Sequence, residues 1–107
     1  MRLVDLDPEF LARDDDRHFH YVDDIGDADG VWFLCPKCFA GSGRAGTHSV
    51  LCWAPNVPQT TGPQPGRWEL TGTGLEDLTL VAGSSSVQLI GDCQAHFFIR
   101  NGEVLMA

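Results

Sequence analysis

Residues 31–38 read Val-Trp-Phe-Leu-Cys-Pro-Lys-Cys, an apolar run followed at once by two cysteines. Four consecutive apolar residues between turn signals are typical of a short buried strand. Two thiols separated by two residues can point at one metal ion from a tight turn. This stretch therefore predicts a strand that delivers the chain to a metal-binding corner at Cys35 and Cys38.

The same Cys-x-x-Cys spacing occurs in thiol redox proteins, where a helix follows the first cysteine inside a βαβ unit. Residues 39–43 read Phe-Ala-Gly-Ser-Gly, which is a poor start for a helix. Metal binding is therefore the favoured interpretation of the pair.

A tetrahedral site needs two more ligands. The chain offers His18, His20, His48, Cys52, Cys93 and His96. The Cys93-Gln94-Ala95-His96 stretch follows the turn pair Gly91-Asp92 and precedes an apolar run, so its spacing predicts a second tight corner. We predict a structural zinc site formed by Cys35, Cys38, Cys93 and His96, which joins two distant corners of the chain.

His48 and Cys52 are the alternative ligands, each as a substitute for His96 or Cys93. Residues 48–53 read as a strand, and four residues of strand separate the two side chains by about 13 Å. The two side chains therefore cannot both reach one ion. If Cys52 is not a ligand, it is an ordinary buried thiol. His18 and His20 share one face of an alternating segment, where a polar surface is the simpler interpretation.

Outward from the two corners, the sequence favours short strands. Asn101-Gly102 between residues 97–100 and 103–106 predicts a β-hairpin, because both residues tolerate positive φ. Residues 78–81 and 87–90 predict a second hairpin around residues 83–86. Residues 18–22, 48–53 and 67–70 are extended, residues 55–66 are irregular, and residues 5–13 form a helical turn with Asp7 as N-cap. We expect one domain over residues 1–107, a zinc-stabilised β-sandwich or curled antiparallel sheet.

The formal charge of −8 is concentrated in residues 1–30, which hold ten acidic residues against three arginines. Such a segment would repel a phosphate backbone, so we expect no nucleic-acid binding. A protein partner would meet the acidic run Asp14, Asp15 and Asp16. No apolar run is long enough to span a bilayer, and the N-terminus lacks the apolar core of a signal peptide, so we expect a cytoplasmic location with reduced cysteines.

No pattern in the sequence specifies a reaction. The His-Glu-x-x-His and His-x-Glu patterns of zinc hydrolases and deaminases are absent. A set of three cysteines and one histidine leaves no open position on zinc for water. These observations argue against an enzyme, and a small zinc metalloenzyme is kept as an alternative.

Three stretches carry a resemblance to a known group of proteins: Phe-Leu-Cys-Pro-Lys-Cys at 33–38, Gly-Thr-His-Ser-Val-Leu-Cys-Trp at 46–53, and Ala-His-Phe-Phe-Ile-Arg-Asn-Gly at 95–102. The chain resembles a family of small uncharacterised proteins of tailed phages and prophages. It departs from the family at residues 77–81, where relatives carry a Pro-Thr-x-x-Pro-Ser segment. The resemblance implies a phage product in the bacterial cytoplasm and supplies no reaction.

Two further roles follow from these observations as hypotheses. The first is an accessory protein that binds a host protein, for example a defence factor, through its acidic segment. The second is a structural accessory protein whose sheet edges pair with copies of itself.

Overall fold

The structure is a computed structural model that describes residues 1–83, 86–89 and 93–107. Its helical elements are the 3₁₀ turns η1 (Leu3–Leu6) and η2 (Ile25–Asp27) and the α-helix α1 (Pro36–Ser42). Its strands are β1 (Glu9–Arg13), β2 (Phe19–Val22), β3 (Gly30–Leu34), β4 (Ser49–Trp53), β5 (Glu69–Thr71), β6 (Thr79–Val81), β7 (Ser86–Gln88), β8 (His96–Arg100) and β9 (Glu103–Met106). The prediction of a mainly β fold is confirmed.

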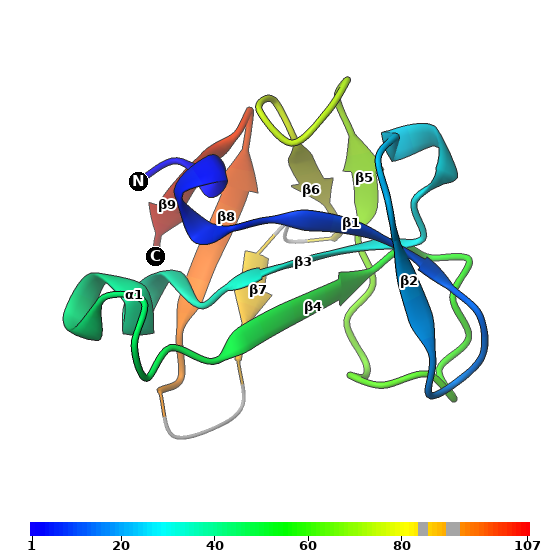
Figure 1. Cartoon of the computed structure of the whole chain (residues 1–107), viewed down its shortest axis with the longest axis horizontal. Helices are drawn as coiled ribbons and strands as arrows, with labels where there is room; N and C mark the ends of the chain where they lie inside the picture. Colours follow the sequence, from blue (N-terminus) through cyan, green and yellow to red (C-terminus); the bar gives the residue numbers. More distant parts are fainter. Residues whose placement is uncertain (84–85, 90–92) are drawn as a thin grey trace.

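The strands form three antiparallel sheets (Figure 1). The largest has the order β2-β1-β3-β4, the second pairs β5 with β6, and the third has the order β7-β8-β9. In the largest sheet, β3 and β4 are joined through α1 and pair from Gly30↔Trp53 to Leu34↔Ser49. This register decides which side chains meet at the ends of the two strands.

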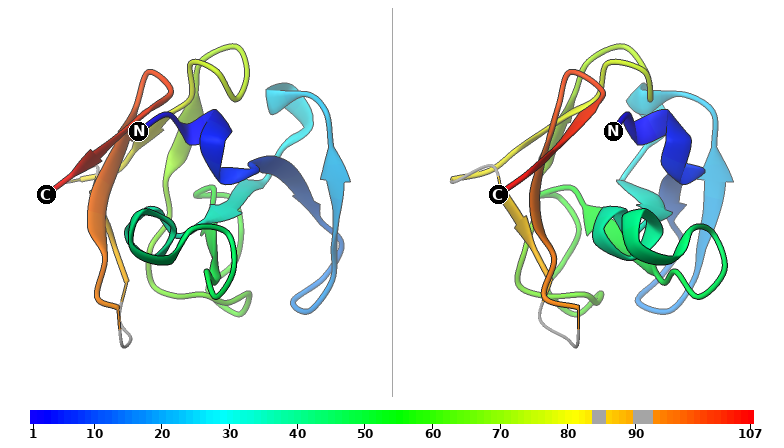
Figure 2. Two further views of the ribbon diagram at one scale, coloured as in Figure 1. Left: turned by 60° about the vertical axis from the view of Figure 1, so that its left-hand side comes forward. Right: turned by 90° about the vertical axis from the view of Figure 1, so that its left-hand side faces the viewer.

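The core lies between the four-stranded sheet and the β7-β8-β9 sheet, which face each other across the molecule (Figure 2). Phe33 of β3 meets Phe97 of β8 edge-on, with ring centroids 5.9 Å apart, and both side chains are fully buried. Such aromatic pairs add to the free energy gained from burying apolar area. The two sheets are therefore held together by apolar contacts across the core.

The predicted C-terminal hairpin is confirmed, with β8 and β9 paired from Phe97↔Met106 to Arg100↔Glu103. Asn101 and Gly102 have φ values of 50° and 75°, as a two-residue turn with positive φ requires. A side chain at position 102 would also collide with the carbonyl oxygen of Glu76. Glycine is therefore needed there for both backbone conformation and close packing.

The N-terminal helical turn lies earlier than predicted. It covers Leu3–Leu6 and ends at Asp7, which has a φ of 50°, so Asp7 terminates this turn and does not begin a helix. Residues 9–13 form β1, because Phe10 and Leu11 are buried in a strand that pairs with both β2 and β3. Pairing on two sides outweighs the local helix signal of Asp7 and Pro8.

The prediction that residues 78–81 and 87–90 form one hairpin is wrong. β6 pairs with β5, and β7 pairs with β8, so the two runs belong to different sheets. Residues 84–85 of the predicted loop, as well as residues 90–92 with the predicted Gly91-Asp92 turn, lie outside the described residues. Alternation of apolar residues identifies a strand but does not identify its partner.

None of the helices in the described parts of the chain is long and apolar enough to cross a lipid bilayer.

The irregular segment 55–66 is organised by one side chain, that of Arg67. Its guanidinium donates hydrogen bonds to the carbonyl oxygens of Val57, Pro58, Thr61, Pro63 and Gly66 at 2.7–2.9 Å. Partial burial of the group lowers the pKa of Arg67, but its usual value is so high that it remains charged. A planar group with five N–H donors can therefore replace the secondary structure that this segment lacks.

We expect Arg67→Met to lower the free energy of unfolding by about 2–3 kcal/mol, because charged hydrogen bonds are lost and carbonyl groups are left without donors. Urea denaturation followed by tryptophan fluorescence measures the change. Arg17→Met is the matched control, since the hydrogen bond of Arg17 comes from its backbone N–H. Equal stability of the two variants would contradict the assignment.

Candidate metal centre

The first corner of the site is formed by the end of β3 and the first turn of α1. Cys35 is the N-cap residue of α1, and Pro36 occupies the first helical position, where its fixed φ suits a helix start. Cys38 follows within the first turn of the helix, so both thiols lie at the same end of α1. Cys35 is fully buried and Cys38 is half-buried.

His48 reaches this corner through the pairing of β3 with β4. The Leu34↔Ser49 pair is the last of the ladder, and one step further the backbone N–H of Cys35 donates to the carbonyl oxygen of His48 at 2.9 Å. Residues opposite each other in an antiparallel pair place their side chains close together. The strand register therefore sets the imidazole of His48 beside the thiol of Cys35.

The second corner carries Cys93, just before β8. Gln94 has a φ of 46°, in the left-handed region, and this turn lets the backbone N–H of Ala95 donate a hydrogen bond to the Cys93 sulfur. The backbone N–H of Leu89 in turn donates to the Ala95 carbonyl oxygen at 2.8 Å. The Cys93 thiol is thereby directed toward α1.

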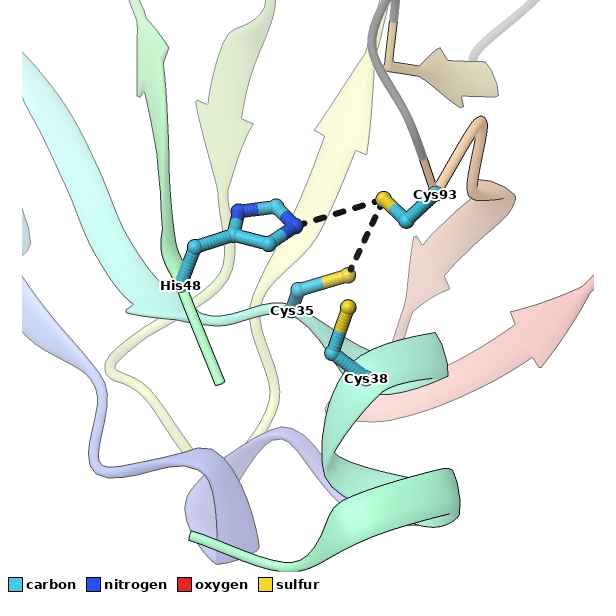
Figure 3. A group of neighbouring side chains, drawn as sticks. All are labelled: Cys35, Cys38, His48 and Cys93. Atoms are coloured by element: carbon cyan, nitrogen blue, oxygen red, sulfur yellow. Dashed lines mark hydrogen bonds between the residues drawn. The ribbon is translucent and has the colours of Figure 1, made fainter. Parts of the chain in front are cut away.

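The four side chains converge on one point (Figure 3). Their ligand atoms all lie within 4.8 Å of one another. The Cys35 and Cys93 sulfurs are 4.0 Å apart, and the His48 Nε2 is 3.2 Å from the Cys93 sulfur. Ligand atoms of a single tetrahedral ion with bonds of about 2.0–2.3 Å lie about 3.5–3.8 Å apart. Cys35, Cys38, His48 and Cys93 can therefore hold one metal ion.

The thiols of this group differ in acidity. The hydrogen bond from the Ala95 N–H and then the contact with His48 lower the pKa of Cys93 to about 7. Desolvation and the neighbouring cysteines raise the pKa of Cys38 to about 11. The hydrogen bond to Cys93 raises the pKa of His48. Cys93 is thus more readily deprotonated than Cys38, and a metal ion would have to displace the proton of Cys38 on binding.

One step of the sequence argument for a metal site is wrong, because a helix does follow Cys35. α1 is seven residues long and ends before Gly43, whose φ of 68° is suited to a helix terminus. However, β3 and β4 on either side of α1 are antiparallel neighbours, whereas a βαβ redox unit requires parallel strands. A histidine and a third cysteine also lie against the pair. The antiparallel strands and the additional histidine and cysteine therefore favour metal binding over a redox role for the cysteine pair.

The group contains three of the four predicted ligands, Cys35, Cys38 and Cys93, together with the predicted substitute His48. Among the residues that the structure describes, His96 is not part of it. His96 is half-buried at the start of β8, with its ring 6.1 Å from that of Phe98. Alternation along β8 buries Phe97 and Ile99, so His96 and Phe98 share the opposite face.

Cys52 and the remaining histidines lie elsewhere. Cys52 lies within β4 opposite Val31 and is fully buried, which raises the pKa of its thiol. His18 and His20 are exposed and contact Asp15 and Asp14. All four cysteines of the chain have free thiols.

The three acidic residues predicted to meet a partner lie in the turn between β1 and β2. Asp14 and Asp15 contact the two histidines named above. Asp16 accepts hydrogen bonds from Thr61, Arg13 and Thr60 at 2.7–2.9 Å, which hold the pKa of its carboxyl at about 2. Each carboxylate therefore already has a partner within the chain, and Asp16 connects this turn to the segment 55–66.

Comparisons with known proteins supply no relative: no family model, curated protein or solved structure matches the chain. The resemblance to small phage proteins therefore stays a prediction from sequence. The site is interpreted from its own chemistry.

Proposed function

We propose that the chain binds one zinc ion through Cys35, Cys38, His48 and Cys93, and that the ion stabilises the fold. The observation that carries this proposal is the convergence of three thiols and one imidazole nitrogen within 4.8 Å. Three sulfur ligands and one nitrogen ligand in a tetrahedron are a donor set typical of structural zinc. Thiolates are poor ligands for calcium and magnesium, which take oxygen.

The spacing of the ligand atoms supports a mononuclear ion. An iron–sulfur cluster also uses cysteine ligands, but its ligands bind different iron atoms and so lie further apart. Here every pair of ligand atoms is within reach of a common centre. One ion bound by four protein ligands has no open position, so the proposed role is structural rather than catalytic.

The placement of the ligands explains what the ion would stabilise. Cys35, Cys38 and His48 belong to the β3-α1-β4 unit of the four-stranded sheet, and Cys93 leads into β8 of the three-stranded sheet. An ion bound by all four side chains would therefore join the two layers that face each other across the core. It would also close a long loop, which reduces the entropy of the unfolded chain.

Elemental analysis and native mass spectrometry of the purified chain test the proposal. We expect one zinc per chain in the unmodified protein, and loss of that zinc in the Cys93→Ser variant. Cys52→Ser is the matched control, because this thiol lies in the core and should leave the metal content unchanged. A metal-free native chain, or iron in place of zinc, would refute the zinc assignment.

The biological role is inferred from the sequence alone. A phage-type accessory that binds a host protein, a self-associating accessory protein and a small metalloenzyme stay predictions. The proposed zinc site is compatible with the first two, because each needs a stable β scaffold and no open metal position.

A further inference from the structure

The chain has a single lysine, Lys37, and it lies between the two cysteines of the first corner. Its side chain is exposed, and its Nζ donates a hydrogen bond to the backbone carbonyl oxygen of Cys93 at 2.5 Å. This bond joins residues 56 positions apart in the sequence. It therefore connects the two corners of the metal centre without using a ligand atom.

Cys93 is the ligand that depends most on such a connection. Cys35 and His48 are held by the pairing of β3 with β4, and Cys38 lies within α1. Cys93, by contrast, lies before β8 and outside every strand of the described chain. The bond from Lys37 holds its backbone, and the Ala95 N–H directs its sulfur. The two contacts together determine where the fourth ligand lies.

The charge of Lys37 acts in the same direction. A divalent ion bound to three thiolates and a neutral imidazole carries a net negative charge. An ammonium group beside Cys93 offsets that charge, whereas an uncharged side chain would not. Two other basic side chains are engaged elsewhere: Arg44 pairs with Asp7, and Arg100 lies over the ring of Phe98.

We propose that Lys37 is a positioning residue of the metal centre, which fixes Cys93 and neutralises part of the charge of the bound ion. This inference rests on the proposed zinc function. It gives Lys37, which is not itself a ligand, a role in the affinity for the metal ion.

Zinc affinity of the full chain, measured by competition with a chromophoric chelator, tests the inference. We expect Lys37→Met to bind zinc about tenfold more weakly, because loss of groups that orient ligands costs about 10–100-fold in affinity. Lys37→Arg keeps a charged donor and should stay within about threefold of the unmodified chain. Arg17→Met, in the β1–β2 turn, removes the same charge away from the site and should have no effect.

Cobalt substitution separates positioning from loss of the site. The Co²⁺ form of Lys37→Met should keep the intense absorption of tetrahedral thiolate coordination, because all four ligands remain. Unchanged zinc affinity in Lys37→Met, or equal weakening by Lys37→Arg, would overturn the role of Lys37 alone. Absence of zinc from the unmodified chain would overturn the zinc proposal and this inference with it.

Discussion

Removal of the proposed zinc ion with a strong chelator is expected to abolish the cooperative folding of this chain at room temperature. Domains of this size have free energies of unfolding of about 5–15 kcal/mol. Structural zinc contributes apparent binding free energies of about 10–16 kcal/mol in small zinc domains. Because the proposed ion joins the two layers of the fold, its loss removes a contribution as large as the whole net stability.

Thermal unfolding followed by far-ultraviolet circular dichroism measures this effect. A loss of about 5 kcal/mol would already lower Tm by roughly 20–40 °C in a domain of about 100 residues. We therefore expect either a fall of at least this size or the absence of a transition. Readdition of Zn²⁺ should restore the original curve, and Mg²⁺ should not.

The Cys93→Ser variant serves as the control for effects of the chelator itself. Its unfolding curve should resemble that of the metal-free chain and should not change when chelator is added. A metal-free chain that keeps its Tm would show that the apolar core between the sheets suffices, and that the ion has no structural role.

The fold was largely predictable where local chemistry and tertiary contacts agree. The apolar run at 31–34 forms a buried strand, and the Asn101-Gly102 pair turns a hairpin, because a two-residue turn with positive φ admits few other sequences. The irregular character of residues 55–66 followed from their prolines and glycines. The role of Arg67 in holding this segment could not be predicted, since its hydrogen bonds depend on how the segment folds back on the arginine.

Two of the errors share one physical origin, which is the pairing of strands. Asp7 and Pro8 resemble a helix start, but β1 is held between β2 and β3. Residues 79–81 form β6, which pairs with β5 and not with β7, and the alternation of apolar residues does not specify that partner. The short helix α1 is an error of another kind: residues 39–43 are a poor helix start, but the helix begins earlier, at Pro36. Local propensity is a weak prior wherever burial and pairing decide.

The candidate site shows the same division. Sequence spacing singled out Cys35, Cys38 and Cys93, three members of the cluster, because paired or turn-flanked thiols are recognisable locally. His48 was placed among the substitutes, since its position depends on the register of β3 with β4. The observed register, with Leu34 opposite Ser49, puts Cys35 beside His48 and places Cys52 opposite Val31, well away from the corner. The sequence alone does not give the register of β3 with β4, and this register decides which histidine joins the cysteines.

Replacement of His48 by alanine is expected to lower zinc affinity by more than about 100-fold, because loss of groups that merely orient a ligand already costs up to that much. The side chain is exposed, so the cost falls on metal binding rather than on the core. His96→Ala should leave the affinity within about threefold, since substitutions away from a site change free energies by about 0.5 kcal/mol or less. Competition with a chromophoric chelator compares the two variants.

His48→Cys provides the matched restoration, because four cysteines also form a tetrahedral structural zinc site. This variant should bind zinc again, and its Co²⁺ form should show stronger thiolate-to-metal absorption than the unmodified chain. Weak binding in His96→Ala with normal binding in His48→Ala would instead assign the fourth ligand to β8. The strand alternation that places His96 on the same face as Phe98 would then have to change when the ion binds.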